Sequence, residues 1–314
     1  MKRVLLTGAT GFIGKQTIPY LLSLGYEVHA VYNHNMITEN SSAVIWHRAN
    51  LLDFEVQRRL LAEVAPTHLL HLAWYTQPQL YWNSIENTTW VQASIELVKN
   101  FVGHGGIRAV FGGSCAEYDW HYSLCSEKST PLNPNTLYGT CKDSLQKIVT
   151  YMAEDMQFSF AWGRIFFVYG PGEYPQRLVP SVINALLCGK QAQCSHGKQI
   201  RDFLYVKDVA NAFVTLLASQ VLGPINIASG KPVSIQEIVS NIAYKLALPE
   251  NVQFGAIPLD FTEPIAILGD ITRISYELGW EPQYMLDAGL QETIEWWKRK
   301  SLLGGYKNNE MSHM

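Results

Sequence analysis

Residues 3–24 read RVLLTGATGFIGKQTIPYLLSL, and this stretch decides the fold of the chain. It begins with Arg3–Thr7, a short and largely apolar run that predicts a strand, and ends with Gln16–Leu24, which predicts a helix. The loop between them carries the glycines Gly8, Gly11 and Gly14. Glycines let the backbone turn sharply and approach a pyrophosphate, and the helix N-terminus offers N–H groups and partial positive charge to phosphates. This order therefore predicts a dinucleotide-binding site.

Strands alternate with helical patterns through the first half of the chain. The further strands predicted there are Val28–Tyr32, Ala43–His47, His68–Leu72, Ala109–Gly112 and Phe158–Ile165. Such alternation is typical of a parallel, doubly wound sheet with right-handed crossovers, which binds ligands at the carboxyl ends of its strands. Later segments predict a helix over Leu178–Leu187, a strand over Ile225–Ala228 and a helix over Ala288–Arg299, with Asp208 placed to begin another helix.

A second pattern, Tyr138-Gly-Thr-Cys-Lys142, carries acid/base chemistry. Residues four apart lie on one face of a helix, and a nearby ammonium lowers the pKa of a phenol from its usual value of about 10. Such a phenol can give a proton to a carbonyl oxygen, or take one from an alcohol, at pH 7. Ser114 follows the predicted strand Ala109–Gly112 and can donate a hydrogen bond to an oxygen on which charge develops.

The motif TGATGFIG at residues 7–14, followed by YGTCK at residues 138–142, resembles the extended short-chain dehydrogenase/reductase family of nucleotide-sugar epimerases, dehydratases and reductases. The resemblance implies an α/β fold: a Rossmann-type doubly wound parallel sheet with a smaller mixed α/β substrate-binding lobe at the C-terminal side. We expect the dinucleotide-binding domain to span residues 1–170 plus about 201–229, and the substrate-binding lobe 171–200 plus about 230–300. Residues 304–314 are expected to form a loose tail.

The resemblance also implies roles for individual residues. Tyr138 is expected as the acid/base, Lys142 as the cation that also binds the nicotinamide ribose, and Ser114 as a hydrogen-bond donor to the substrate. Cofactor contacts are expected from Gly8, Thr10, Gly11, Phe12, Ile13, Gly14, Tyr32, Asn33, His34, Asn50, Leu51, Leu72, Ala73, Trp74, Tyr138 and Lys142. Substrate contacts are expected from Ser114, Cys115, Arg177 and Arg201. For Arg201 a salt bridge to Asp202 or another acid remains an alternative, and His71 is expected to be structural.

Three departures from the family pattern bear on the reaction. Phe167 stands where the family often has an asparagine that contacts the substrate diphosphate. Cys115 and Ala116 follow Ser114, where 4,6-dehydratases have an acidic pair, so dehydratase activity is disfavoured. Tyr32 ends the second predicted strand, where NAD-selective members place a carboxylate. Since no carboxylate is there to repel a 2′-phosphate, we expect NADP, with NAD as the alternative.

Composition excludes several other classes of protein. The net charge is −3, from 24 basic and 27 acidic residues, and no basic stripe indicates nucleic acid. No apolar run is long enough for a membrane span, and no charged leader precedes the first strand, so we expect a cytoplasmic protein. The five scattered cysteines indicate free thiols, and the nine histidines show no metal-binding spacing, so no metal is expected.

The leading functional hypothesis is an oxidoreductase that uses NAD(P)H to reduce a 4-keto group on a nucleotide-activated deoxysugar. A C4 epimerase of nucleotide sugars with tightly bound NAD is the alternative, because it needs the same residues. A non-catalytic NAD(P)-binding regulatory protein is a third hypothesis. Family analogy suggests a homodimer that pairs through two long helices of each subunit.

Overall fold

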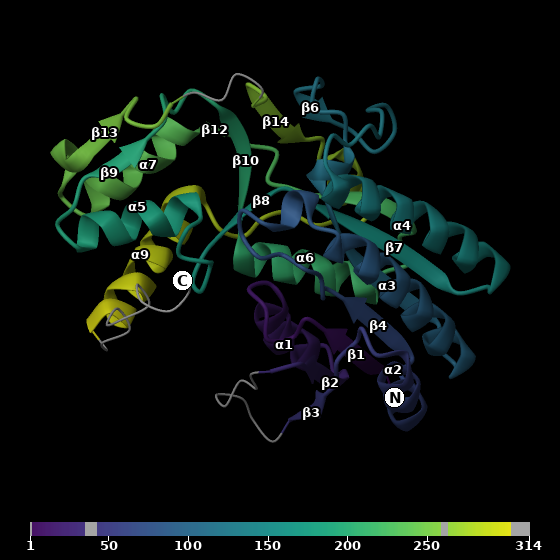
Figure 1. Ribbon diagram of the computed structural model, residues 1–314. Coiled ribbons are helices and arrows are strands. Elements are labelled where there is room, and N and C mark those ends of the chain that lie inside the picture. The colour runs from purple at the N-terminus through teal and green to yellow at the C-terminus, as the bar shows by residue number, and fades with distance from the viewer. Residues whose placement is uncertain (1, 35–42, 259–262, 303–314) are drawn as a thin grey trace.

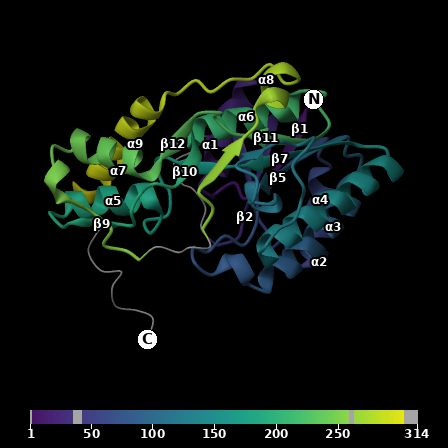
Figure 2. The same ribbon diagram turned by 90° about the horizontal axis from the view of Figure 1, so that it is seen from above.

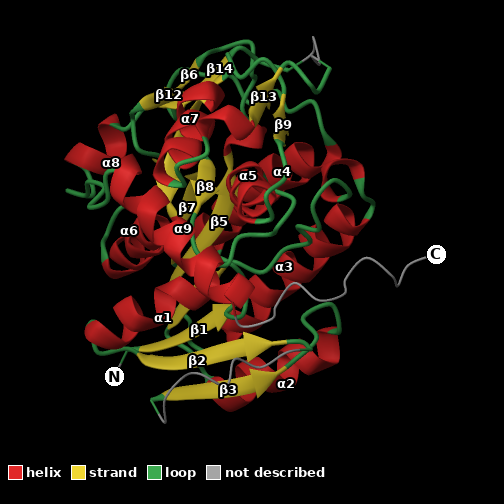
Figure 3. Ribbon diagram, turned by 90° about the vertical axis from the view of Figure 1, so that its left-hand side faces the viewer, coloured by secondary structure: helices red, strands yellow, loops and turns green. Residues whose placement is uncertain are grey.

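A parallel sheet forms the centre of the molecule. The computed structural model describes residues 2–34, 43–258 and 263–302, and within these ranges seven strands form the first sheet, in the order β11-β7-β5-β4-β1-β2-β3. The strands are β1 (Arg3–Thr7), β2 (Glu27–Tyr32), β3 (Val44–Arg48), β4 (His68–His71), β5 (Arg108–Ser114), β7 (Ser159–Ile165) and β11 (Gly223–Ile227). All of their pairings are parallel, as the arrows of β1, β2 and β3 illustrate in Figure 3. The predicted parallel sheet is confirmed, with strand ends shifted by one or two residues.

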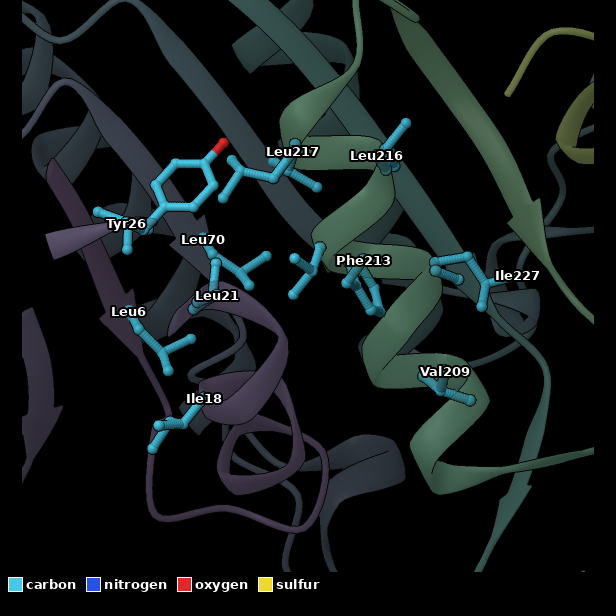
Figure 4. Packing of buried hydrophobic residues seen from close by; sticks show 14 of the residues in the cluster. Leu6, Ile18, Leu21, Tyr26, Leu70, Val209, Phe213, Leu216, Leu217 and Ile227 are labelled. Atoms are coloured by element: carbon cyan, nitrogen blue, oxygen red, sulfur yellow. The ribbon is translucent and has the colours of Figure 1, made fainter. Parts of the chain in front are cut away.

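Helices cover both faces of this sheet (Figure 2). One face carries α1 (Gly14–Ser23), α6 (Val206–Ala218) and α8 (Thr272–Tyr276), and the other carries α2 (Phe54–Val64), α3 (Glu86–Gly103) and α4 (Leu137–Asp155). On the first face, Ile18 of α1 and Phe213 of α6 are buried against Leu6 and Leu70 of the sheet (Figure 4). The doubly wound arrangement follows from this burial of apolar side chains on both sides.

A smaller lobe gathers beyond the carboxyl ends of the first sheet, around α5, α7 and α9 (Figure 1). Its second sheet has the order β12-β10-β14-β6, and β8 also pairs with β10. The bounds are β6 (Leu124–Cys125), β8 (Phe167–Tyr169), β10 (Ile200–Tyr205), β12 (Pro232–Ser234) and β14 (Ala266–Gly269), with a separate pair β9 (Ala192–Cys194) and β13 (Val252–Phe254). The helices are α5 (Leu178–Leu187), α7 (Ile235–Lys245) and α9 (Leu286–Leu302). Short 3₁₀ turns occur at η1 (Tyr81–Asn83), η2 (Cys115–Glu117) and η3 (Pro249–Asn251).

The segment 201–229, which we expected in the dinucleotide-binding domain, is divided between the two sheets. Strand β10 pairs with β8, β12 and β14, whereas α6 packs on the first sheet and β11 pairs with β7. The domain boundaries therefore remain a prediction. The expected tail at 304–314 lies outside the described residues. Within the described ranges, no helix has the length and apolar character needed to cross a bilayer, and no group of three potential ligand side chains is placed to hold a metal ion.

Capping side chains set several helix starts, but not the one expected at Asp208. The Asp53 carboxylate accepts hydrogen bonds from the N–H groups of Glu55 and Val56 and caps α2. Helix α6 instead begins at Val206, so Asp208 is its third residue and the expected cap is wrong. Its carboxylate accepts N–H groups of a distant loop, those of Gln283 and Tyr284. An acidic side chain in the first helical turn suits either use, because both compensate exposed N–H groups.

A buried carboxylate, Asp202, joins three segments of the second sheet. It accepts the backbone N–H and hydroxyl of Ser229, both at 2.7 Å, and the N–H groups of Gly230 at 2.9 Å and Gly269 at 3.3 Å. The side chain is fully buried. Removal of the carboxylate would leave these donors without a partner inside the protein, which is the costly case for a hydrogen bond.

We expect Asp202→Ala to lower the free energy of unfolding by roughly 2–4 kcal/mol, because several buried donors lose their acceptor. Denaturant unfolding followed by circular dichroism measures this. The exposed cap variant Asp53→Ala is the control and should cost about 1 kcal/mol. A loss for Asp202→Ala no larger than for the control would contradict the role of Asp202.

Candidate active site

The glycine loop folds tightly against two strand ends. Gly8 directly follows β1 with φ of +67°, and a Cβ on it would lie 2.8 Å from the backbone nitrogen of Ala73. A Cβ on Gly14 would lie 2.0 Å from the carbonyl oxygen of Gly8. The N–H of Gly11 donates to that same carbonyl at 2.9 Å. The rest of the loop, Thr10, Phe12 and Ile13, is partly exposed. The loop thus offers bare backbone and the start of α1, which fits a dinucleotide pyrophosphate.

The residues expected to contact the adenosine half of the dinucleotide follow β2 and β3. These are Tyr32, Asn33, His34, Asn50 and Leu51. Tyr32 packs edge-on against Trp46, with ring centroids 6.2 Å apart. Asn33, His34 and Asn50 are exposed, and Leu51 is buried in the core under α2. The parallel sheet places all of them on the same edge as the glycine loop.

His71 ends β4 and fixes the segment beside Gly8. Its Nδ1 is 2.7 Å from the hydroxyl of Thr7 and its Nε2 is 3.0 Å from that of Ser94. Burial lowers the pKa of His71 to about 3, so the ring is neutral. The Thr7 hydroxyl also accepts the N–H groups of Leu72 and Ala73. These contacts fit the structural role expected for His71.

A buried ion pair supports the turn that carries Ser114. The N–H of Ser114, the last residue of β5, donates to Glu117 at 2.7 Å. Glu117 is fully buried and accepts Nε of Arg164 at 2.6 Å and Nε1 of Trp162 at 2.9 Å. The Ser114 hydroxyl accepts the N–H of Ala116. Sequence analysis missed this pair, although an acid three residues after a strand-end serine is the pattern of a capping box.

Tyr138 is the second residue of α4, and the side chain of Ser114 hydrogen-bonds to its phenol. Burial raises the pKa of Tyr138 above its ordinary value, the neighbouring Tyr81 raises it further, and the bond from Ser114 opposes the change. The expectation that Lys142 lowers this pKa is therefore wrong for the protein alone. The physical reason is that burial disfavours the phenolate while the ammonium is directed elsewhere.

Lys142 lies one turn further along α4 and is buried. Its ammonium donates to the carbonyl of Gly112 at 2.8 Å and lies 3.7 Å from the ring centroid of Trp74. Burial lowers the pKa of Lys142 to about 7, and the carboxylate of Glu117 opposes this. The structure thus brings Ser114 and Tyr138 into contact and holds Lys142 beside Gly112, near the end of the same strand, β5.

An aromatic wall that the sequence analysis missed surrounds the phenol. Tyr81 and Trp82 of η1 both meet the ring of Tyr138 edge-on, with centroids 4.9 and 5.8 Å away. Trp120 meets Trp82 at 6.1 Å. These rings come from segments without a regular hydrophobic period, so only the density of aromatic residues in the sequence hinted at them.

The two arginines expected to contact substrate lie in different surroundings. A guanidinium N–H of Arg177 donates to the hydroxyl of Tyr81 at 3.4 Å, so Arg177 reaches the aromatic wall. Arg201 is buried and pairs with the carboxylate of Glu263 at 2.7 Å. The ion pair that the sequence left open as an alternative is therefore present, with Glu263 rather than Asp202 as the acid.

Cys115 and Phe167 pack in one hydrophobic cluster. Burial raises the pKa of the Cys115 thiol, so its reactive thiolate is disfavoured. The Arg201 guanidinium acts on the pKa of that thiol in the opposite direction. The guanidinium also lies 5.5 Å from the ring of Phe167. Phe167, which stands where the family pattern predicts an asparagine, thus packs against a side chain of the protein.

Comparisons with known proteins show what this chain is similar to. A profile described as the NAD dependent epimerase/dehydratase family matches residues 4–228. The UDP-glucose 4-epimerase of Neisseria meningitidis serogroup A is 24% identical, over 94% of this chain and 97% of its own length. The dTDP-4-dehydro-6-deoxyglucose reductase of Escherichia coli is also 24% identical, over 93% of this chain and 96% of its own.

Among solved structures, the UDP-glucose 4-epimerase of Thermotoga maritima with UDP-glucose superimposes with a TM-score of 0.87. The match covers 96% of this chain and 99% of that one, at 22% identity. At this identity the likeness shows the fold. The doubly wound sheet and the smaller lobe are thus common to both chains.

We expect Gly14→Ala to weaken dinucleotide binding at least about tenfold, because the added methyl group would displace the Gly8 carbonyl and distort the loop. Titration of the protein with NADPH and NADH, followed by fluorescence or calorimetry, measures the change in affinity. Gly103→Ala is the matched control, since its Cβ would meet nothing within 4 Å. Equal affinities for the two variants would show that the loop does not bind the dinucleotide.

Proposed function

Because the chain belongs to the NAD-dependent epimerase/dehydratase family, we propose that it reduces the 4-keto group of a nucleotide-activated deoxysugar with NADPH. The observation that carries the proposal is the contact of Ser114 with Tyr138, next to Lys142, without an acidic pair beside them. This set supports transfer of one hydride and one proton and lacks the groups for elimination. The reductase among the relatives has a name that describes the same chemistry.

Each side chain has a role that its position supports. The nicotinamide, when bound, supplies the hydride to the carbonyl carbon. Tyr138 donates its phenolic proton to the carbonyl oxygen, and Ser114 donates a hydrogen bond to that oxygen as charge develops. The phenolate left behind regains a proton from solvent, and the buried ammonium of Lys142 is held at the Gly112 carbonyl, near where the nicotinamide ribose is expected. A phenol with a raised pKa favours the proton-donor form, as a reductase requires.

Dehydratase activity is not proposed, because neither of the two residues directly after Ser114 is an acid and the Glu117 carboxylate is paired with Arg164. Cys115 and Ala116 follow Ser114 and are buried. Burial raises the pKa of the Cys115 thiol, so it does not ionise in the neutral range, and an alanine methyl group transfers no proton.

A C4 epimerase with tightly bound NAD is the second candidate, because a relative of equal identity is an epimerase. Epimerisation at one carbon requires the keto sugar to present its opposite face before the hydride returns. Tyr81 and Trp82 pack edge-on against Tyr138, and we expect rings in this position to hinder such a rotation. This favours reduction of the ketone over its inversion. The non-catalytic regulatory hypothesis lacks a comparable observation in its favour.

Two arginines support a diphosphate-bearing substrate. Arg177 lies at the N-terminus of α5 and reaches Tyr81, so a ligand against the aromatic wall would meet its guanidinium. Arg201 pairs with the exposed side chain of Glu263, which a phosphate can replace. A guanidinium suits two phosphate oxygens at once.

The cofactor preference for NADP gains support from Arg48, which the sequence analysis did not consider. Arg48 ends β3 and is the register partner of Tyr32 at the end of β2. Parallel register partners project to the same face of a sheet, and Arg48 is exposed. A guanidinium at this edge suits the 2′-phosphate that distinguishes NADP from NAD.

A homodimer is proposed by family analogy, through α3 and α4. These helices pack side by side on the outer face of the first sheet (Figure 1). Ile148 and Tyr151 of α4 are exposed, and apolar side chains of this kind suit a contact between subunits.

The purified protein, mixed with NADPH and a dTDP-4-keto-6-deoxyhexose, should consume NADPH and form one mole of 4-hydroxy sugar nucleotide per mole. Tyr138→Phe should reduce turnover at least about a thousandfold, because the proton donor is lost, and leave NADPH affinity within about threefold. Absorbance at the reduced nicotinamide band follows the reaction, and product is identified by chromatography.

Tyr75→Phe removes a phenol outside the Ser114 contact and is the matched control, with activity expected near that of the unaltered protein. Protein purified with stoichiometric NAD that interconverts UDP-glucose and UDP-galactose would establish the epimerase instead. Retention of most activity in Tyr138→Phe would refute its acid/base role.

We expect Arg48→Ala to raise the Kd for NADPH about tenfold and to change the Kd for NADH less than about twofold, because only NADPH carries the 2′-phosphate. Parallel titrations of both dinucleotides measure the ratio. A ratio unchanged by the substitution would remove Arg48 from the cofactor site.

A further inference from the structure

The Lys142 ammonium lies near two indole rings. The ring centroid of Trp74, which follows β4, is 3.7 Å from Nζ, and that of Trp162 of β7 is 5.8 Å from it. The N–H of Trp162 is bound to Glu117, so this ring belongs to the buried support beneath Ser114. Trp74 comes from the strand end expected to border the dinucleotide. The ammonium thus has one aromatic neighbour from the buried support and one from the strand end expected to border the dinucleotide.

Trp74 is fixed in this place by a buried hydrogen-bond network. Its Nε1 donates to Oδ1 of Asn87 at 2.8 Å, and Asn87 is fully buried in α3. The amide nitrogen of Asn87 donates to the carbonyls of Tyr81 at 2.7 Å and Ser84 at 2.8 Å. One asparagine therefore anchors both the ring on Lys142 and the aromatic wall at the phenol.

The ammonium needs this ring because its other contacts are few. An ammonium has three N–H donors, and within the described residues the carbonyl of Gly112 is the acceptor bound to it. Removal of a charge from water is costly unless it is compensated. The face of an indole carries partial negative charge, and its attraction for a cation increases when the pair is shielded from water. At 3.7 Å Trp74 supplies that compensation.

The charged and titratable groups that act on Lys142 are on the elements around it. Glu117 of η2 favours the ammonium, and so does the Cys141 thiol on its own helix. His71 of β4 is neutral, since burial lowers its pKa to about 3. Burial of Lys142 itself acts against the ammonium and is the largest effect. The balance is close, so the loss of one favourable contact should change the protonation of Lys142 near neutral pH.

We infer that Trp74 is a positioning residue that keeps the Lys142 side chain protonated and directed to the end of β5, where the nicotinamide ribose is expected. The inference rests on the proposed function for its catalytic meaning. Its physical content, that the indole stabilises the ammonium, concerns the protein alone. Trp74 was expected from the sequence only as a cofactor contact.

The test is the titration of Lys142 in protein labelled with ¹³C at the lysine Cε atoms. The Lys142 resonance is identified by its loss in Lys142→Arg. In Trp74→Leu, which keeps an apolar side chain, the midpoint of the Lys142 titration should fall by about one pH unit, because the ammonium loses the ring that stabilises it. Trp74→Phe retains a smaller aromatic face, and its midpoint should fall by about half a unit.

Trp90→Phe is the matched control, because Trp90 packs against Trp74 at 6.2 Å and is absent from the rings over the ammonium. Its midpoint should equal that of the unaltered protein. An unchanged midpoint in Trp74→Leu, or an equal fall in Trp90→Phe, would overturn the inference. If Trp74→Leu does not fold, Trp74→Phe decides: a lowered midpoint supports the inference and an unchanged one overturns it.

A second measurement connects the ring to cofactor binding. Affinity for NADPH should decline with rising pH, and in Trp74→Leu the decline should begin about one pH unit lower, because the positive charge of the Lys142 ammonium favours binding of the negatively charged cofactor. If every reductase assay fails but the Lys142 midpoint falls in Trp74→Leu as expected, the proposed function is rejected and the role of Trp74 is kept. If the reductase works but the Lys142 midpoint does not shift, the proposed function is kept and the role of Trp74 is rejected.

Discussion

The close packing of the glycine loop between β1, β4 and α1 is the constraint on which the site depends. Gly14 lies so near the carbonyl of Gly8, and Gly8 so near Ala73, that side chains at these glycines are excluded. This approach fixes the N-terminus of α1 over the carboxyl edge of the first sheet. Since the strands are parallel, the same edge receives Ser114 from β5 and Trp74 after β4. One edge thus holds the glycine loop, proposed to bind phosphate, next to the residues proposed to transfer a proton.

Burial is the main electrostatic influence at this edge. It raises the pKa of Tyr138 and lowers that of Lys142, so it favours the neutral form of both groups. The phenol then stays protonated as a donor. The ammonium depends on the neighbours that compensate it, which are the Gly112 carbonyl, the Trp74 ring and the more distant Glu117. Site chemistry here is set by aromatic and backbone groups as much as by formal charges.

The sequence predicted those features that depend on local pattern. Strand positions, the glycine loop and the helix over Leu178–Leu187 follow from periodicity and backbone freedom, and they agree with the structure. The contact of Ser114 with Tyr138 follows from their motifs. The cap at Asp208 was wrong, because a distant loop at Gln283 takes that carboxylate, and local pattern does not reveal a partner so far along the chain.

The features that the sequence did not reveal depend on register and long-range packing. Arg48 meets Tyr32 only through the pairing of β2 with β3, and Glu117 meets Arg164 only through the pairing of β5 with β7. The pKa of Tyr138 was predicted in the wrong direction because spacing places a lysine nearby without giving the direction of its ammonium. For the first two contacts the missing information is which strand lies beside which, and at what offset; for Tyr138 it is the burial of the phenol and the direction of the ammonium.

The most direct test of the account is the fate of the hydride. With NADPH deuterated at the transferred position of the nicotinamide C4, the account predicts one deuterium at C4 of the sugar product and none elsewhere, detected by mass spectrometry and proton NMR. A sugar product that forms without deuterium at C4 would contradict the claim that Tyr138, Ser114 and Lys142 act on a carbonyl facing the nicotinamide.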